Sequence, residues 1–237
     1  MLKILLLTTS LACLPVAAQT CQAQSGPRQT TLVELYTSEG CDSCPPADRW
    51  LSGLKGKPDV LAAAFHVDYW DRLGWKDRFG DARHTARQVE MQRSSGAGFS
   101  YTPQVLANGR DSRRDNALPV PGAPARVLLA LQRDSDERVS VRAEPQAGAP
   151  TRLALWWALL EDGHVSQVKA GENRGATLKH DHVVRRYEAL PAWAAPGVGQ
   201  WTLSAPRTGE GGRRSRVLVV ATDAATGAPL QAAQLDC

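Results

Sequence analysis

Two cysteines separated by two residues form the motif with the clearest chemistry in this chain. Cys41 and Cys44 follow a strand-like run over residues 31–37 and precede Pro45 and Pro46. Because proline lacks a backbone N–H, it is tolerated in the first turn of a helix, where these groups have no partner in any case. The thiols are therefore expected at a helix N-terminus, where the helix dipole favours a thiolate. This placement predicts thiol–disulfide exchange, with Cys41 as the attacking thiol and Cys44 as the resolving thiol.

The first residues have the pattern of a secretory signal. Lys3 precedes an apolar run over residues 4–14, which is too short to span a bilayer and is followed by the small residues Ala17 and Ala18. We expect residues 1–18 to be a signal peptide and the mature protein to be periplasmic or secreted. Thiols are commonly oxidised in those compartments.

The cysteine count agrees with an oxidised protein. Of the five cysteines in the chain, Cys13 is removed with the signal peptide, which leaves an even number. With Cys41 and Cys44 paired to each other, the other pair is Cys21 and Cys237, and we predict a structural disulfide between them. The alternative is that both chain ends fray and these two thiols are incidental.

The charge of the chain indicates no polyanionic partner. The formal net charge is +4, and the basic residues are interspersed with acidic ones along the sequence. No run of charge marks a nucleic-acid or membrane surface. We therefore expect neither nucleic-acid binding nor a membrane span.

The order of the predicted elements divides the chain into an α/β domain over residues 29–136 and an all-β, sandwich-like domain over residues 137–237. In the first we predict strands at residues 32–36 and 60–67, helices at 47–54, 77–93 and 125–132, and a hairpin that turns at Asn108 and Gly109. In the second, apolar runs between Gly- and Pro-bearing turns predict strands at residues 139–141, 153–160, 165–169, 182–187, 200–204, 217–222 and 230–235.

The predicted β-α-β unit brings separate segments to one edge of a sheet. Because its two strands are parallel, residues 66–70 emerge beside Cys41. An antiparallel strand that begins at the same edge brings Thr102 and Pro103 there as well. Tyr69 and Trp70 are then either an apolar platform for a substrate or packing for a long connection.

A Cys-x-x-Cys turn that opens a helix, followed by Thr102 and Pro103 before a hairpin, resembles the thioredoxin fold. The resemblance implies that Pro103 is cis and faces the disulfide, and that Thr102 offers backbone groups to an extended substrate. It also implies for Glu34, which interrupts the apolar strand before the cysteines, the role of a buried acid that carries a proton for the resolving thiol. This chain has one more residue between that acid and Cys41, and the alternative for Glu34 is an edge glutamate in water.

Four segments in combination resemble an uncharacterised family of secreted bacterial proteins, the domain of unknown function 1223. They are residues 33–48, 65–71, 101–104 and 171–175. This resemblance implies a thioredoxin-like first domain and an exported location, and it brings no established substrate. The sequence assigns no role to residues 171–175 or to residues 180–182.

These observations predict an exported thiol–disulfide oxidoreductase that acts on cysteine-bearing proteins and exchanges electrons with a redox partner. It needs no cofactor besides the Cys41–Cys44 disulfide. One alternative is a periplasmic protein that binds or delivers copper or zinc through Cys41, Cys44 and His66. Another is a non-catalytic binding scaffold in which the disulfide is a permanent staple.

Overall fold

The computed structural model describes residues 21–112, 118 and 122–237, so the predicted signal peptide lies outside the described residues. Its helices and strands in chain order are β1 Gln22–Gln24, β2 Thr31–Thr37, α1 Pro45–Ser52, β3 Val60–His66, η1 Asp71–Leu73, α2 Ala82–Ser95, β4 Gln104–Ala107, β5 Arg110–Asp111, β6 Val127–Ser135, β7 Arg138–Pro145, β8 Arg152–Glu161, β9 His164–Gln167, β10 Thr177–His180, β11 Val183–Ala194, β12 Gly199–Ser204, η2 Glu210–Gly212, β13 Ser215–Asp223 and β14 Pro229–Leu235.

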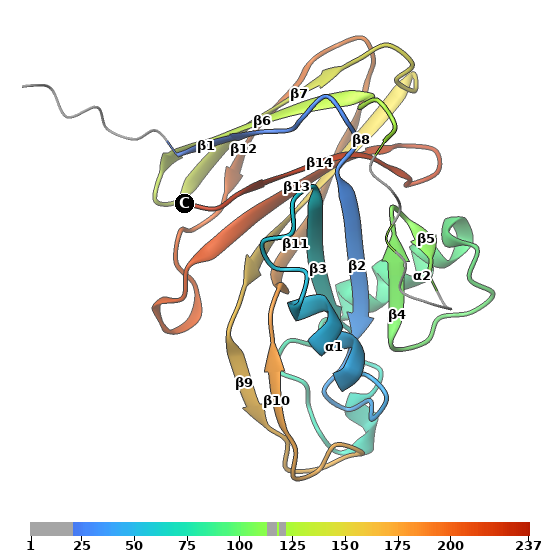
Figure 1. Ribbon diagram of the computed structural model, residues 1–237, viewed down its shortest axis with the longest axis vertical. Helices are drawn as coiled ribbons and strands as arrows, with labels where there is room; N and C mark the ends of the chain where they lie inside the picture. The colour runs from blue at the N-terminus through green and yellow to red at the C-terminus, as the bar shows by residue number, and fades with distance from the viewer. Residues whose placement is uncertain (1–20, 113–117, 119–121) are drawn as a thin grey trace, which may run out of the picture.

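One eight-stranded sheet runs through the molecule in the order β14-β13-β8-β11-β3-β2-β4-β5 (Figure 1). It joins strands from both halves of the chain, because β11 pairs in parallel with β3 at Val183 and Ala64. A four-stranded sheet, β1-β6-β7-β12, covers one end of it, and β9 with β10 forms a separate hairpin at the opposite end (Figure 1). Strands β2 and β3, which lead to the Cys41–Cys44 turn and to residues 66–70, therefore lie inside this sheet and not at its edge.

The core has parts on both faces of the long sheet. Side chains of β6 and β7 pack against β8, β13 and β14 in the largest part. Alternate residues of β2 point to opposite faces of the sheet, as in any strand. Leu32 and Tyr36 pack in the cluster that includes Met91 of α2, whereas Val33 and Leu35 pack against α1. The two helices are thus held on opposite faces of β2.

The bounds of both helices follow from local signals. Pro45 and Pro46 occupy the first turn of α1, where no backbone N–H is needed. The Asp81 carboxylate accepts a hydrogen bond from the backbone N–H of Arg83 and caps the start of α2. That helix ends at Gly96, whose φ of 85° is open to glycine and unfavourable for most other residues.

The predicted fold class, an α/β thioredoxin-like domain followed by an all-β domain, is wrong: the fold is mainly β. The described part of the chain contains two α-helices. Residues 125–132, predicted to be a helix, lie largely in β6, where Val127, Leu129 and Leu131 are buried in alternation. A short run of Leu and Ala does not show that period, since its outward residues are apolar too. Four strands after residue 150, β8, β11, β13 and β14, also extend the sheet that contains β2 and β3. The division of the chain at residues 136 and 137 stays a prediction.

The two chain ends of the described part lie side by side. A disulfide joins Cys21 to Cys237 across a sequence separation of 216 residues, with 5.8 Å between the two Cα atoms. It links the residue before β1 to the end of the segment that follows β14 (Figure 1). The predicted pairing of these two cysteines is therefore present in the structure.

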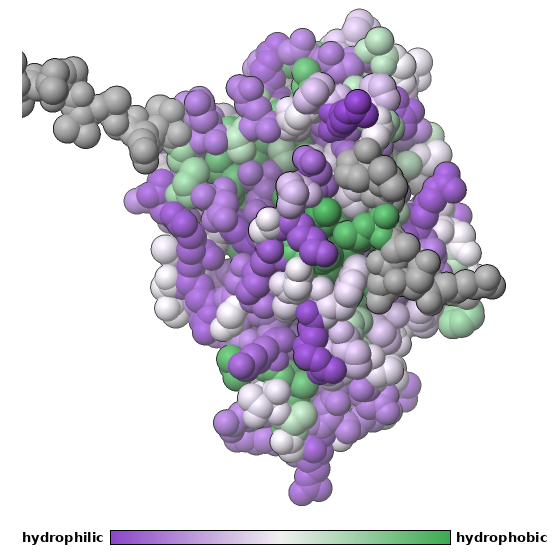
Figure 2. Space-filling model, viewed as in Figure 1, coloured by the Kyte–Doolittle hydropathy of each residue, from purple (hydrophilic) through white to green (hydrophobic). Residues whose placement is uncertain are grey.

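Hydrophobic residues on the face shown in Figure 2 occur in separate small areas on a mostly hydrophilic surface. In the described part of the chain, the large hydrophobic side chains that are exposed are Val89, Phe99, Val165 and Val198. Among the described residues, no helix combines the length and the apolar character that crossing a membrane requires.

Candidate functional site

Cys41 and Cys44 form a disulfide at the N-terminus of α1, with 5.4 Å between their Cα atoms. Cys44 is the N-cap, and its carbonyl oxygen accepts hydrogen bonds from the backbone N–H groups of Ala47 and Asp48. The chain reaches this turn through Gly40, where a Cβ would lie 2.9 Å from the Cβ of Trp70. The helix start therefore places the two sulfurs where the dipole stabilises negative charge.

Both half-cystines are buried. Cys41 is 1% exposed and Cys44 is fully buried, although Asp42 and Ser43 between them are exposed. Thiol–disulfide exchange requires direct contact between an attacking sulfur and the disulfide. In this conformation a protein thiol has no room to approach Cys41.

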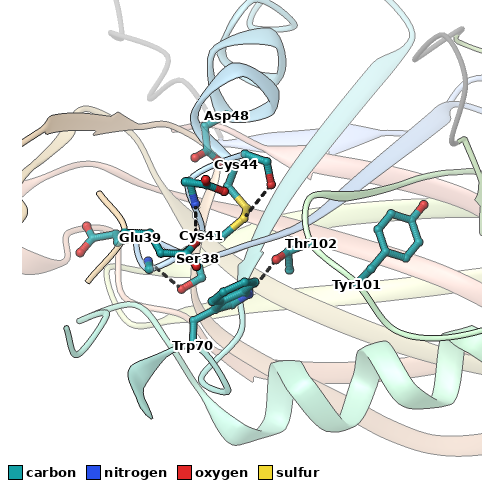
Figure 3. The surroundings of a disulfide bond; sticks show 12 residues. Ser38, Glu39, Cys41, Cys44, Asp48, Trp70, Tyr101 and Thr102 are labelled. Atoms are coloured by element: carbon teal, nitrogen blue, oxygen red, sulfur yellow. Dashed lines mark hydrogen bonds between the residues drawn. A yellow bond between two sulfur atoms is a disulfide. The ribbon is translucent and has the colours of Figure 1, made fainter. Parts of the chain in front are cut away.

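The predicted substrate residues surround one side of the turn. The Thr102–Pro103 peptide bond is cis, and the indole N–H of Trp70 donates a 2.7 Å hydrogen bond to the Thr102 hydroxyl (Figure 3). The Tyr69 hydroxyl donates instead to the side chain of Gln88 in α2, at 3.2 Å. Trp70 and Thr102 are thus fixed to each other beside the cysteines, whereas Tyr69 is engaged with α2.

A small pocket opens next to this turn. Its volume is about 300 Å³, and its lining includes Ser43, Pro46, Tyr101 and Pro103. It therefore lies between the exposed side of the α1 N-terminus and the segment that carries the cis proline. An approaching side chain can enter here without contact with the sulfurs.

Glu34 lies on the face of β2 turned to α2, in a buried ion pair with Arg87. Arg87 also donates to the Tyr187 hydroxyl and lies over the rings of Trp156 and Phe65, 4.5 Å and 5.2 Å from their centroids. Because side chains alternate along a strand, one extra residue before Cys41 turns this carboxylate to the face opposite α1. The structure places it in a structural ion pair and not beside the resolving cysteine.

Asp48 takes the position that the sequence reasoning gave to Glu34. It lies one helical turn after Cys44, at the i+4 position on the same face of α1. Figure 3 shows Asp48 and Trp70 on opposite sides of the disulfide. Burial raises the pKa of Asp48, although His66 and His180 nearby oppose the shift. The spacing from Cys44 was the signal in the sequence that would have identified this acid.

A cluster of buried ionisable groups extends from the disulfide turn. Nε2 of His180 lies 3.2 Å from Oε1 of Glu39, and Nδ1 of the same ring lies 3.9 Å from the carboxylate of Asp48. The rings of His180 and His66 have their centroids 4.9 Å apart. Nδ1 of His66 is 2.7 Å from Oδ2 of Asp77. Two imidazoles and three carboxylates are therefore packed together behind Cys41 and Cys44.

The ionisable groups of this cluster differ in how easily they ionise. Burial favours the neutral forms of Asp77 and His66, but their mutual attraction outweighs it, lowers the pKa of Asp77 to about 2 and raises the pKa of His66. Burial likewise opposes ionisation of Glu39, yet its pKa is lowered by the adjacent His180 and Ser166 side chains and by a 2.7 Å hydrogen bond from the indole N–H of Trp75. At neutral pH the cluster thus contains ionised Glu39 and Asp77, next to an Asp48 that resists ionisation.

The three residues predicted as alternative metal ligands, Cys41, Cys44 and His66, are not arranged as a ligand set in this structure. Nδ1 of His66 is engaged with Asp77, and its Nε2 is buried without a hydrogen-bond partner. Within residues 21–112, 118 and 122–237, no group of three or more His, Cys, Asp or Glu side chains is arranged to hold a metal ion. Copper or zinc binding through Cys41, Cys44 and His66 stays a prediction that this geometry does not support.

The hairpin of β9 and β10 contacts the disulfide turn through its tip, residues 171–175. Nδ2 of Asn173 donates hydrogen bonds of 2.9 Å and 2.8 Å to the carbonyl oxygens of Glu39 and Cys41. The Glu172 carboxylate accepts a 3.2 Å hydrogen bond from the backbone N–H of Asp42. This tip comes from the second half of the chain, and sequence reasoning gave it no role.

The model of the family described as "Protein of unknown function (DUF1223)" matches residues 32–221. The chain belongs to this family. The crystal structure of protein AGR_C_4864 from Agrobacterium tumefaciens is similar to this DUF1223 protein, with a TM-score of 0.63 and 24% identity over 87% of this chain and 94% of the other. HBP35 of Porphyromonas gingivalis is similar with a TM-score of 0.60 and 15% identity, over 90% of this chain and 76% of the other. At these identities the likeness concerns the fold. No match is found among curated proteins.

The segments that gave the resemblance to DUF1223 meet at the disulfide. Residues 33–48 contain most of β2 and the Cys-x-x-Cys turn, and residues 65–71 supply His66 and Trp70. Residues 101–104 contain the cis bond, and residues 171–175 form the hairpin tip that hydrogen-bonds to the turn. Four stretches that are distant in the sequence of this DUF1223 chain thus form one site.

Proposed function

We propose that this DUF1223 protein is an exported thiol–disulfide oxidoreductase that acts on cysteine-bearing proteins through Cys41 and Cys44. The observation that carries the proposal is the combination of a disulfide at a helix N-terminus with a buried acid, Asp48, one turn further along the same helix. A structural staple needs no such acid. Disulfide exchange does, because a proton must be delivered to or taken from the second sulfur.

The reaction is a balanced exchange of two electrons and two protons. A thiolate of the partner attacks Sγ of Cys41, a mixed disulfide forms, and the electron pair of the Cys41–Cys44 bond moves to Sγ of Cys44. Asp48, whose pKa burial raises, lies one helical turn after Cys44 and in this scheme protonates that sulfur. A second thiolate of the partner then displaces Cys41, so the partner leaves as a disulfide and Cys41 and Cys44 remain as the reduced pair. The reverse sequence reduces a partner disulfide.

Trp70 and Thr102 have positioning roles in this scheme. Their hydrogen bond fixes an apolar ring against Gly40 and the start of the cysteine turn. The pocket beside Pro46 and Pro103 offers space for a partner side chain close to, and not on top of, the sulfurs. A protein segment bound there would bring its own cysteine to the turn.

The deciding experiment is the redox equilibrium of the Cys41–Cys44 pair in the chain without residues 1–18. The protein is equilibrated in buffers of graded glutathione or dithiothreitol potential, alkylated, digested and analysed by mass spectrometry, so that Cys21–Cys237 is followed separately. We expect a reversible transition of the Cys41–Cys44 peptides, which Cys41→Ser and Cys44→Ser each abolish. A pair that is never reduced while the protein stays folded contradicts the proposal.

Asp48→Asn tests the acid. We expect it to slow resolution of the mixed disulfide by about 100-fold at neutral pH, the usual size of a general acid–base contribution, and to change the shape of the pH–rate profile. Asp42→Asn is the matched control, because it removes a carboxylate from the same motif at an exposed position. Equal pH–rate profiles of the two variants would show that Asp48 has no part in proton transfer.

The burial of both sulfurs favours a second candidate, a binding scaffold in which Cys41–Cys44 is a permanent staple. The same titration separates the two functions. A staple resists reduction until the protein unfolds, whereas an exchange site is reduced with the fold intact.

A further inference from the structure

A buried disulfide can react only if groups around it move, and one element that is bound to the backbone of the cysteine turn belongs to a separate hairpin. The hairpin of β9 and β10 pairs only with itself among the described strands, from Thr177 and Gln167 to His180 and His164. It projects beyond the end of the eight-stranded sheet and lies along α1 (Figure 1). Its movement would therefore break no strand pairing of the two larger sheets.

The base of this hairpin is firmly attached. Nε2 of His164 is 2.8 Å from Glu161 at the end of β8. The carboxylate of Asp181 accepts a 3.0 Å hydrogen bond from the backbone N–H of Gly163 and pairs with Lys55, which follows α1, at 2.8 Å. The base is thus tied both to the main sheet and to the segment that follows α1.

The tip is attached differently, by two side chains that bind backbone groups of the cysteine turn. Asn173 donates to the carbonyl oxygens of Glu39 and Cys41, and Glu172 accepts from the N–H of Asp42. Two glycines with positive φ, Gly171 at 71° and Gly175 at 89°, flank these side chains. A Cβ at Gly171 would lie 3.4 Å from the Cβ of Trp75, so the tip also packs closely on the loop after η1.

The groups that the tip occupies are those with which a peptide pairs. Asn173 and Glu172 engage two backbone acceptors, at Glu39 and Cys41, and one backbone donor, at Asp42, within one four-residue stretch. An extended peptide presents alternating N–H and C=O groups to such a set. The tip therefore fills, with side-chain amide and carboxylate groups, the hydrogen-bonding positions that an incoming substrate backbone could use.

We propose that residues 171–175 are a lid on the disulfide, with Asn173 as its latch, and that an extended cysteine-bearing peptide displaces the lid and takes over its hydrogen bonds. The inference rests on the proposed oxidoreductase function and adds how access to Cys41 is controlled. Closed, the lid keeps the disulfide from small thiols and unrelated proteins. Open, it exposes the turn to a partner that replaces the lost contacts.

The test is the rate at which dithiothreitol reduces Cys41–Cys44 in the folded chain, measured by timed alkylation and mass spectrometry. Asn173→Ala removes both latch hydrogen bonds, and we expect reduction to become about 5- to 150-fold faster, the range that follows from two ordinary hydrogen bonds. Thr177→Ala is the matched control, because it removes a neutral, exposed side chain from the same hairpin, and it should leave the rate unchanged. A rate for Asn173→Ala equal to that of wild type overturns the lid.

Two further measurements keep the test decisive if Asn173→Ala is poorly folded, as judged by circular dichroism. Asn173→Asp keeps the shape and loses the donor, and it should show the same acceleration. Glu172→Ala should speed hydrogen exchange of the Asp42 amide and also accelerate reduction; no change in either overturns the proposal.

Faster reduction by dithiothreitol without any exchange with cysteine-bearing peptides would retain the lid and refute the oxidoreductase function, so the two failures are distinguishable. A disulfide that no variant allows to be reduced refutes both.

Discussion

Replacing Cys21 and Cys237 together by serine is expected to lower the free energy of unfolding by about 5 kcal/mol. The disulfide closes a loop with a sequence separation of 216 residues. A cross-link of that length removes about 18 cal/mol/K of entropy from the unfolded chain, which corresponds to about 5 kcal/mol at room temperature. The effect acts on the unfolded state, because the native strands β1 and β14 that flank the link keep their own pairing with β6 and β13.

Urea denaturation of the oxidised proteins measures this difference. The midpoint should fall, and the slope of the free energy against urea should rise, because the released chain exposes more surface when it unfolds. The double variant Cys41→Ser with Cys44→Ser is the matched control: its link spans a separation of 3 residues, for which the same relation gives about 2 kcal/mol. A smaller loss for the long link than for the short one would refute the entropic reasoning.

Three further predictions concern buried charges. Arg87→Met should cost about 3–5 kcal/mol of stability in urea denaturation, because it leaves the Glu34 carboxylate buried and uncompensated, and adding Glu34→Leu should restore much of it. Burial lowers the pKa of His84 to about 4, below its value in the unfolded chain. The neutral ring therefore stabilises the fold fully above about pH 6.5, and this part of the free energy of unfolding, about 3 kcal/mol at most, is lost as the pH falls towards 4. Thermal melts of His84→Gln should show a melting temperature that depends less on pH in that window. Asp77→Asn should lower the pKa of His66, measured by NMR titration, since the Asp77 carboxylate raises it; an unchanged pKa would contradict the ion pair.

The sequence was most informative where structure is set by neighbours in the chain. Pro45 and Pro46 can lie only in the first turn of a helix, and that requirement alone places the cysteines. Asn108 and Gly109 both have positive φ at the turn between β4 and β5, which few other residue pairs allow. Each predicted strand after residue 138 overlaps an observed one, because turn residues separate the apolar runs.

Features that depend on contacts between distant segments could not be read in the same way. The parallel pairing of β11 with β3 has no local signature, since both strands are simply apolar and buried. The face on which Glu34 lies depends on the register of β2 relative to the sheet, which a single inserted residue reverses. The contact between Asn173 and the cysteine turn joins residues 132 positions apart, and neither segment alone indicates the other.

The site combines residues of α1, next to the cysteines in the sequence, with residues of the β9–β10 hairpin, far from them in the sequence. Asp48 belongs to the helix that the cysteines begin, so its place relative to Cys44, on which its proposed proton transfer depends, is set as soon as α1 forms. In the proposed lid, Asn173 belongs to the hairpin tip that moves, so it would control access without changing the bond that reacts. His180, at the end of the same hairpin, connects the two parts because it lies between Glu39 and Asp48. Because His180 lies at the base of the hairpin, which is tied to the main sheet and to Lys55, opening of the lid at residues 171–175 would leave this imidazole between Glu39 and Asp48. In the proposed scheme the lid therefore changes access to the disulfide and leaves the charges beside Asp48 as they are.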